Sequence, residues 1–206
     1  YDTYAETPGA DDNASGVAVL LELASLLSKE TFAKTLRFVA FANEEPPFFK
    51  SASMGSLRYA ELCKKAGEKV EFMICLESVG YFSSEENSQK YPFPLKYFYP
   101  DKGDFISIVS NMPSKNLMKR CADSFRKASS LRVEHLSAPQ SFVPHIALSD
   151  QWSFWKQGYK AVMVSDTAFL RTPYYHTKND TPEKLDYEKM AEVVKGTKQA
   201  IEDLAK

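Results

Sequence analysis

Short apolar segments alternate with longer segments of helical spacing along most of this chain. Strand-like apolar runs occupy residues 35–42, 70–76, 105–109, 133–136 and 161–164. Helical spacing and helix-start signals are found at residues 13–29, 53–66, 114–129, 152–155 and 186–204. Strands that alternate with helices predict an α/β fold, here a three-layer sandwich around a mostly parallel central sheet. Ligands of such sheets bind at the carboxyl ends of the strands, so functional residues are expected there.

Size, charge and cysteine content limit what the chain can do. Its 206 residues are enough for one domain with a sizeable core, and residues 1–206 are expected to form a single domain. The formal net charge of −1 shows no basic excess, which argues against nucleic acid or an anionic membrane surface as a partner. No apolar run approaches the ~20 residues of a membrane-spanning segment. Cys63, Cys75 and Cys121 have no CxxC spacing, so neither a disulfide framework nor a thiolate metal site is expected.

Capping residues indicate where helices start, and one long segment without periodicity indicates a loop. Asn13 or Ser15 can cap the first helix, Ser114 a later one and Asp186 the last one. Residues 83–104 mix Ser, Glu, Asn, Pro and aromatic side chains without a period. We interpret them as a loop excursion, because structureless loops of this length are usually functional or mobile.

Acidic and histidine residues stand at the ends of several of these elements. They are Asp11, Asp12, Glu44, Glu45, Glu77 and His176. A parallel sheet brings the ends of its strands together, so these side chains can converge although they are far apart in sequence. Oxygen and imidazole ligands without thiolate suit zinc, manganese or a similar divalent ion. One carboxylate can bridge two ions roughly 3.5–4 Å apart, as in two-metal hydrolases.

The adjacent pair Glu44 and Glu45 is the most informative of these. Two neighbouring carboxylates repel each other unless a cation or a proton lies between them. A metal can bind one of them and leave the other free to take a proton from water. The simpler explanation of the pair alone is a solvated loop with two charges, just as Asp11 and Asp12 alone could be an acidic helix start.

His176 lies in an aromatic, proline-flanked loop, YYHTKNDTP. Asp180, four residues on, can orient the imidazole ring or cap the segment. A purely structural histidine is the alternative at this position. His135 and His145 have no acidic neighbour of this kind, and no role is assigned to them.

Five ordered motifs resemble those of the M28 family of zinc aminopeptidases. They are PGADDNASG, FANEEPPFFKSASMGS, MICLESVGYF, LSDQWSFW and DTAFLRTPYYHTKNDTPEKLDYEKMAEVV. The resemblance runs from Tyr1 into the last helix. It implies the phosphorylase/hydrolase-like α/β sandwich of zinc exopeptidases and the hydrolysis of amino-terminal residues from peptide substrates. It also favours a secreted or periplasmic location over a cytoplasmic one.

The resemblance assigns roles to residues at matching positions. Asp12 resembles the carboxylate that bridges two zinc ions. Glu45 and His176 resemble further ligands of one ion, and Glu77 resembles a ligand of the other. Glu44 resembles the general base.

Two departures from the family pattern stand out. The family reads His-x-Asp at its first motif; Asp2 matches the Asp, but the His would fall directly before Tyr1. We therefore expect this chain to be part of a longer protein, and the 206 residues alone to be inactive or nearly so and poorly soluble or unstable. The family often reads Ser-Asp-His where this chain has Ser149-Asp150-Gln151, which weakens any ion contact there. Asp180 resembles a residue that positions a ligand.

Two other functions remain open from the sequence. Glutaminyl cyclases resemble these peptidases and use a single zinc, held by residues that match Asp12, Glu45 and His176. A peptidase-like domain that has lost its metals is the non-enzymatic alternative. The number of bound ions in the full-length protein separates the three: two, one or none. Tyr81, Phe82 and the aromatic residues of 83–104 are candidates for recognising the substrate side chain.

Overall fold

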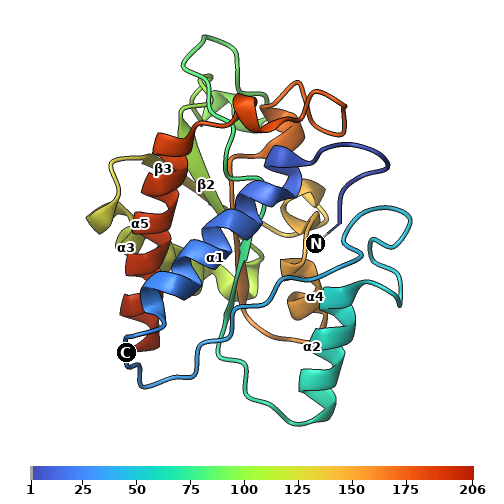
Figure 1. Ribbon diagram of the computed structural model, residues 1–206, viewed down its shortest axis with the longest axis vertical. Coiled ribbons are helices and arrows are strands. Elements are labelled where there is room, and N and C mark those ends of the chain that lie inside the picture. The colour runs from blue at the N-terminus through green and yellow to red at the C-terminus, as the bar shows by residue number, and fades with distance from the viewer. Residues whose placement is uncertain (1) are drawn as a thin grey trace.

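A four-stranded sheet lies at the centre of the computed structural model, which describes residues 2–206 (Figure 1). In spatial order its strands are β1 (Met73–Leu76), β4 (Ala161–Ser165), β2 (Phe105–Ser110) and β3 (Arg132–Ser137). β1 pairs with β4 in parallel and β2 with β3 in parallel, whereas β2 and β4 are antiparallel. The sheet is thus mostly parallel, as predicted, but its central pairing is not. β1 and β4 deliver their carboxyl ends to one edge of the sheet, and β2 and β3 deliver theirs to the opposite edge.

Helices cover both faces of the sheet, which makes the fold the expected three-layer α/β sandwich. On one face lie α1 (Gly16–Leu27), α3 (Lys115–Ala128) and α5 (Tyr187–Ala205), with α5 in contact with the other two. On the other face α2 (Gly55–Lys65) packs against α4 (Gln151–Lys156). Figure 1 shows α1 and α5 crossing in front of the sheet.

Each face of the sheet has its own apolar core. The larger core joins α1, α3 and α5 to the sheet and includes the fully buried Ile106, Ile108 and Phe125. The smaller core joins α2 and α4 to the sheet and includes Ala60 and Phe154. Alternate side chains of a strand point to opposite faces, so the same strands contribute to both cores.

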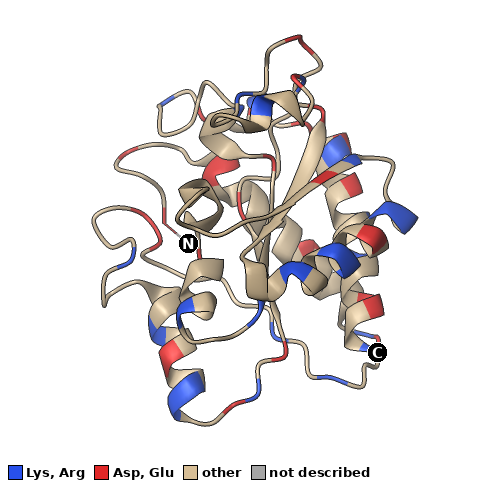
Figure 2. Ribbon diagram, turned by 180° about the vertical axis from the view of Figure 1, so that it is seen from behind, with Lys and Arg blue, Asp and Glu red and all other residues tan. Residues whose placement is uncertain are grey.

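The cysteines, the hydropathy of the helices and the distribution of charge were each considered from the sequence. Cys63, Cys75 and Cys121 are free and buried, and Cys75 lies within β1 as a small core residue. Within residues 2–206, no helix is long and apolar enough to cross a membrane. Lys and Arg are scattered over the chain together with Asp and Glu (Figure 2).

The helix starts follow the predicted capping chemistry at two places. Asp186 caps α5, since its carboxylate accepts a hydrogen bond from the Lys189 N–H at 3.0 Å. At the start of α1 the capping side chain is Asn13 rather than Ser15, because Asn13 Oδ1 accepts a hydrogen bond from the Gly16 N–H at 3.2 Å. Short helical turns connect the longer elements; they are Ala10–Ser15, Leu95–Tyr97, Met112–Ser114, Pro144–Ala147, Ala168–Leu170 and Pro182–Lys184.

The predicted cap at Ser114 is wrong. The Ser114 hydroxyl accepts a hydrogen bond from the Ala161 N–H at 3.2 Å, which ties the start of α3 to the start of β4. Capping is supplied one turn earlier, where the side chain of Asn111 accepts from the Ser114 N–H at 3.1 Å.

The strand predicted at residues 35–42 is absent from the sheet. This segment has no regular secondary structure, and the backbone of residues 35–41 makes no hydrogen bond to any part of the chain that the structure describes. The predicted strand at 70–76 is shortened in the same region and begins only at Met73. A cavity of about 550 Å³ separates the two segments, so neither can pair with the other.

Residues 83–104 form a loop excursion whose two ends are joined. The Ser83 N–H donates to the Gly103 carbonyl at 2.9 Å. In its interior, the Gln89 side chain accepts from Arg171 Nε at 2.8 Å and donates to Thr167 Oγ1 at 2.9 Å. These contacts hold the excursion against the loop that follows β4.

We predict that Gly196→Ala destabilises the fold even though alanine favours a helix by about 1 kcal/mol. A Cβ at Gly196 would lie 2.4 Å from the ring of Phe125, which is fully buried between α3 and α5. Overpacking of this kind typically costs about 1–3 kcal/mol, so the melting temperature should fall by several degrees. The exposed Lys195→Ala on the same helix is the control and should leave it nearly unchanged. An unchanged or raised melting temperature for Gly196→Ala would contradict this packing.

Candidate metal centre

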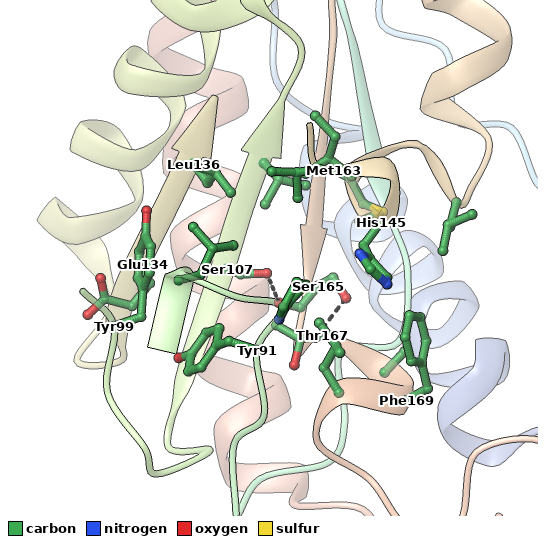
Figure 3. A pocket seen from close by; sticks show the side chains of 18 of the residues that line it. Tyr91, Tyr99, Ser107, Glu134, Leu136, His145, Met163, Ser165, Thr167 and Phe169 are labelled. Atoms are coloured by element: carbon green, nitrogen blue, oxygen red, sulfur yellow. Dashed lines mark hydrogen bonds between the residues drawn. The ribbon is translucent and has the colours of Figure 1, made fainter. Parts of the chain in front are cut away.

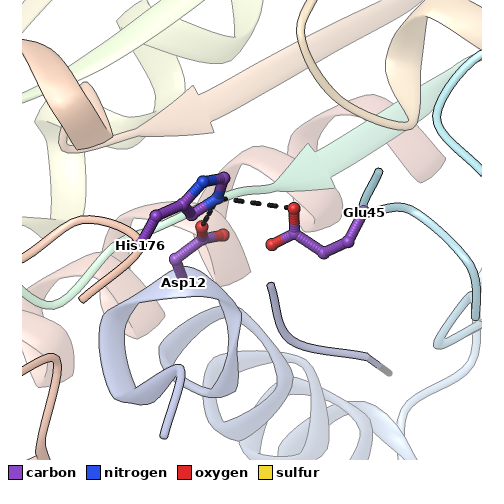
Figure 4. Close-up of side chains that lie close together, drawn as sticks. All are labelled: Asp12, Glu45 and His176. Carbon is purple, nitrogen blue, oxygen red and sulfur yellow. Dashed lines mark ion pairs between the residues drawn. The ribbon is translucent and has the colours of Figure 1, made fainter. Parts of the chain in front are cut away.

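Three side chains from distant parts of the sequence meet at the carboxyl-end edge of β1 and β4. Asp12 lies in the turn before α1, Glu45 lies shortly after the irregular segment 35–42, and His176 lies in the loop between β4 and α5. Each offers one ligand atom, and these atoms lie within 4.8 Å of one another. His176 Nε2 is 3.1 Å from an Asp12 oxygen and 3.4 Å from a Glu45 oxygen (Figure 4).

Two further carboxylates hold the backbone on which these acids stand. Asp180 accepts hydrogen bonds from the successive amides of residues 11–12, at 2.9 and 3.1 Å. Asp2 accepts from the successive amides of residues 44–45, both at 3.1 Å. Asp180 thus positions the turn that carries Asp12. Its carboxylate does not orient the His176 ring or cap its own segment, which were the two roles considered from the sequence. Asp2 likewise positions the Glu pair.

Aromatic stacking fixes the direction of the His176 ring. The ring stacks on Tyr4 with centroids 4.0 Å apart and on Tyr175 with centroids 3.8 Å apart. The backbone of His176 has a φ of 56°, in the left-handed region that non-glycine residues seldom adopt. Sequence reasoning missed Tyr4, whose place beside His176 depends on how the first residues fold back. The aromatic loop around His176 did indicate a positioned ring, and Tyr175, directly before it, is one of the two stacking partners.

Glu77 lies directly after β1 and is buried beside this group but outside the three-ligand set. It accepts hydrogen bonds from Ser149 Oγ at 2.5 Å and from Asn13 Nδ2 at 3.2 Å. Burial raises its pKa well above the usual value, and the charge of Asp12 raises it further. Neither Asn13 nor Ser149 was predicted to bind Glu77.

Glu44 points into the same acidic region. Burial, followed by the charges of Asp150 and Glu45, raises the pKa of Glu44 to about 9. Burial and the charge of Asp12 raise the pKa of Glu45 to about 7. Asp150 is half-buried, and loss of solvation raises its pKa to about 6. The sequence drew attention to Asp150 only through the altered motif that contains it.

The Gln151 amide does not reach these carboxylates. Its side chain is fully buried, and Nε2 donates to the Ile146 carbonyl at 2.8 Å. In this structure Gln151 therefore supports the turn Pro144–Ala147 instead of the candidate metal centre.

The residues present fit a divalent cation. Asp12 Oδ2 and His176 Nε2 are buried polar atoms without a hydrogen-bond partner among the described residues, and they face each other. Buried polar atoms normally have partners, so these two are suited to a ligand between them. Carboxylate oxygens and an imidazole nitrogen are common zinc ligands. A cation would also offset the repulsion among the acids, which stabilises their charged forms.

An apolar cavity of about 110 Å³ adjoins this centre (Figure 3). Glu77 and Tyr175 form its rim toward the centre, and strands β2, β3 and β4 form its floor. The excursion contributes part of the wall through Tyr91, Pro92, Leu95 and Tyr99. His135 and His145, which received no role from the sequence, also line this cavity.

The comparison with known families decides the classification. The model of peptidase family M28 matches residues 1–201. The chain belongs to peptidase family M28. The motifs quoted from the sequence thus indicated the correct family.

Individual proteins that are similar to this chain agree with its assignment to the M28 family. The uncharacterized protein YfbL of Escherichia coli (strain K12) is 44% identical over 92% of this chain and 58% of its own length. A probable leucine aminopeptidase 1 of Trichophyton verrucosum (strain HKI 0517) is 29% identical over 97% of this chain and 49% of its own length. The solved aminopeptidase from Aneurinibacillus sp. strain AM-1 superposes with a TM-score of 0.69 at 26% identity, over 97% of this chain and 40% of that one. This M28 chain therefore spans about half the length of the relatives it matches.

We predict that His176→Ala weakens Zn²⁺ binding by more than about 100-fold, because partners outside the ligand set are alone worth about 10–100-fold. The measurement is a competition titration of Zn²⁺ against a chelating dye. His145→Ala is the matched control, since its ring lies in the apolar cavity beside Phe169, 5.6 Å away between centroids, and should leave the affinity unchanged. Equal affinities for His176→Ala and the unaltered chain would remove His176 from the centre.

Proposed function

We propose that the whole protein is a zinc-dependent aminopeptidase that hydrolyses amino-terminal residues from peptides. The observation that carries this proposal is the group of buried Asp12, buried Glu45 and half-buried His176, with Glu44 directly beside it. Membership of a peptidase family supports it, as do two relatives that carry the name aminopeptidase.

Asp12, Glu45 and His176 would hold one zinc ion. When bound, the ion would polarise the scissile carbonyl and make the attacking water more acidic. We expect a second ion between Asp12 and Glu77 in the whole protein, with Asp12 shared. The burial of Glu77 next to the Asp12 charge supports this expectation, since a cation there would relieve their repulsion.

Glu44 is proposed as the general base. It lies outside the three-ligand group, so its carboxylate is free to exchange a proton. Its pKa of about 9, raised by burial and by Asp150, would keep it protonated at neutral pH without a neighbouring cation. A cation beside a carboxyl lowers the carboxyl's pKa, which allows Glu44 to take a proton from water and pass it to the leaving amine.

The surroundings of the centre suit a peptide with a free amino terminus. The acids at the centre attract the positive α-ammonium group, with Asp2 and Asp150 adding to the negative field. The adjoining apolar cavity would take the side chain of the first residue, because its lining is mostly aliphatic and aromatic. We therefore propose a preference for large apolar amino-terminal residues.

A single-zinc glutaminyl cyclase is the second candidate. The observation in its favour is that Asp12, Glu45 and His176 are the only three-ligand group found within residues 2–206. The two candidates differ in ion content and in product. Assays of the whole protein on aminoacyl peptides and on amino-terminal glutamine peptides, with zinc counted per protein molecule, separate them.

Substitution of the two adjacent glutamates should separate base from ligand. We predict that Glu44→Gln in the whole protein keeps its zinc and loses about 10²–10⁴-fold in turnover, as is typical when a general base is removed. Glu45→Gln should instead lose zinc, because it removes a ligand. Zinc content by mass spectrometry and turnover on an aminoacyl substrate are measured together.

The exposed Glu86→Gln serves as the control and should change neither quantity. Equal zinc loss in Glu44→Gln and Glu45→Gln would show that both residues are ligands and that the base lies elsewhere.

A charge placed in the apolar cavity should change substrate preference. We predict that Leu95→Asp lowers kcat/KM for amino-terminal leucine about 10-fold or more, since burial of a leucine side chain is worth about 1.5–3 kcal/mol. Amino-terminal lysine should gain relative to leucine. Phe98→Asp is the control, because Phe98 is 76% exposed just after the same helical turn and does not line the cavity. Unchanged preference in Leu95→Asp would place the substrate side chain outside this cavity.

A further inference from the structure

Four consecutive backbone amides directly after Glu77 each donate a hydrogen bond to a side chain. The amides of residues 78–81 bind, in this order, Asn13 Oδ1 at 3.0 Å, Ser15 Oγ at 2.9 Å, Asp11 Oδ1 at 2.9 Å and Asp166 Oδ2 at 2.8 Å. Successive amides of a strand point in opposite directions, so one neighbouring strand could not accept from all four. Ser78 and Val79 are fully buried, and buried amides need partners. Side chains therefore supply here the acceptors that a sheet supplies elsewhere.

Three of these four acceptors belong to the turn that carries Asp12. They are the side chains of Asp11, Asn13 and Ser15. Asn13 also binds the end of β1, because its Nδ2 donates to the Leu76 carbonyl at 2.9 Å and to Glu77 at 3.2 Å. The turn that carries Asp12 is thus joined to the segment that follows Glu77 by a continuous series of hydrogen bonds.

The absence of a side chain at Gly80 allows this close approach. A Cβ atom at Gly80 would lie 3.1 Å from Asp11 Oδ1, 3.1 Å from Ser15 Cβ and 2.9 Å from Leu185 Cδ2. Any larger residue would push the segment away from the turn. The hydrogen bonds to Asp11 and Ser15 therefore depend on the glycine between them.

Asp166, the fourth acceptor, is itself held firmly. Its side chain is fully buried just after β4, and its Oδ1 accepts from the Ala168 N–H at 2.8 Å. Its own N–H donates to the Ser78 carbonyl at 2.7 Å. The buried Arg171 donates to the Tyr81 carbonyl at 3.3 Å, and its positive charge acts on Asp166. Asp166 thus fixes the far end of the segment 78–81.

We propose that Asp11, Ser15 and Asp166 are positioning residues that fix Glu77 beside Asp12, where the two carboxylates share a second divalent ion. Carboxylates this close repel each other until a cation lies between them. The hydrogen bonds to residues 78–81 oppose that repulsion, so a second ion finds its ligands already in place. The inference rests on the proposed function, which calls for the second ion, and assigns a role to two buried acids that the mechanism does not use.

Zinc binding to the whole protein tests the proposal. Metal-free protein is titrated with Zn²⁺ by calorimetry, and the first ion is identified as the one that His176→Ala removes. We expect Asp11→Ala to weaken binding of the second ion about 10–100-fold, as is typical when a partner outside the ligand set is lost. The first ion should bind nearly as before, because Asp180 still holds the amides of residues 11–12.

Asp11→Asn separates the effect of position from the effect of charge. Asparagine removes the same negative charge as alanine but keeps an oxygen that can accept from the Gly80 amide. We therefore expect Asp11→Asn to bind the second ion about as tightly as the unaltered protein does. Equal losses in Asp11→Asn and Asp11→Ala would show that only the charge of Asp11 matters, which overturns the proposal.

Ser15→Ala is a smaller change, which covers the case that Asp11→Ala does not fold. It removes only the acceptor of the Val79 amide and should weaken the second ion about 10-fold. Ser124→Ala is the matched control, because Ser124 is equally a buried serine, and its hydroxyl binds Asp203 at 2.8 Å between α3 and α5. Unchanged affinity for the second ion in Ser15→Ala, or in a folded Asp11→Ala, would overturn the proposal.

The ion count of the unaltered protein separates this proposal from the proposed function. Two bound ions, with the second weakened in Asp11→Ala and Ser15→Ala, support the positioning role even if no peptide is hydrolysed, and the proposed function then fails alone. A single bound ion would overturn the positioning role, since Glu77 would hold no ion, and would favour the cyclase. Peptide hydrolysis with two ions that bind all variants equally would leave the proposed function standing and remove the positioning role.

Discussion

The candidate centre depends on two carboxylates that each bind two successive backbone amides. Asp180 holds the turn at residues 11–12, and Asp2 holds the turn at residues 44–45. Hydrogen bonds to a charged acceptor are worth about 1.5–3 kcal/mol each, more than those between neutral groups. The acids of the centre stand on loops rather than within strands. The two carboxylates therefore supply the rigidity that strands would otherwise provide, and they place Asp12 and Glu45 opposite His176.

The same arrangement concentrates negative charge in a poorly solvated place. Burial and mutual repulsion raise the pKa values of Glu44, Glu45 and Glu77 together. A sequence selected for stability alone would avoid such a group, since buried charges are costly unless they are paired. Local rules of stability are broken where chemistry is needed. The acidic region thus supports the edge of the sheet where we propose that the reaction takes place, since charge is balanced over the chain as a whole.

The sequence predicted the layers of the fold and the residues that converge, because both depend on short-range patterns. Helical spacing located α3 and α5, and acids placed after apolar runs located Glu45 and Glu77. The relative direction of neighbouring strands could not be predicted from such patterns, and β4 runs antiparallel to β2. The strand predicted at 35–42 has the right composition, but pairing depends on a neighbour at the correct distance, and a cavity lies there instead.

Contacts between residues of distant loops could not be predicted from the sequence. Tyr4 stacks on His176 only because the first residues fold across the loop after β4, and Ser149 reaches Glu77 only because α4 begins beside β1. Such pairs carry no periodic signal, so residue type alone could not identify them.

The joined ends of the excursion have a consequence for how this scaffold can diversify. Ser83 and Gly103 lie side by side at the base of the loop, and Gln89 fastens its interior to Arg171. The cost of closing a loop grows only slowly with its length, so the segment between these anchors can change in sequence and size while the sheet keeps its geometry. Part of the apolar cavity's wall comes from this segment, so under the proposed function selectivity can evolve, or be engineered by loop exchange, without altering the centre.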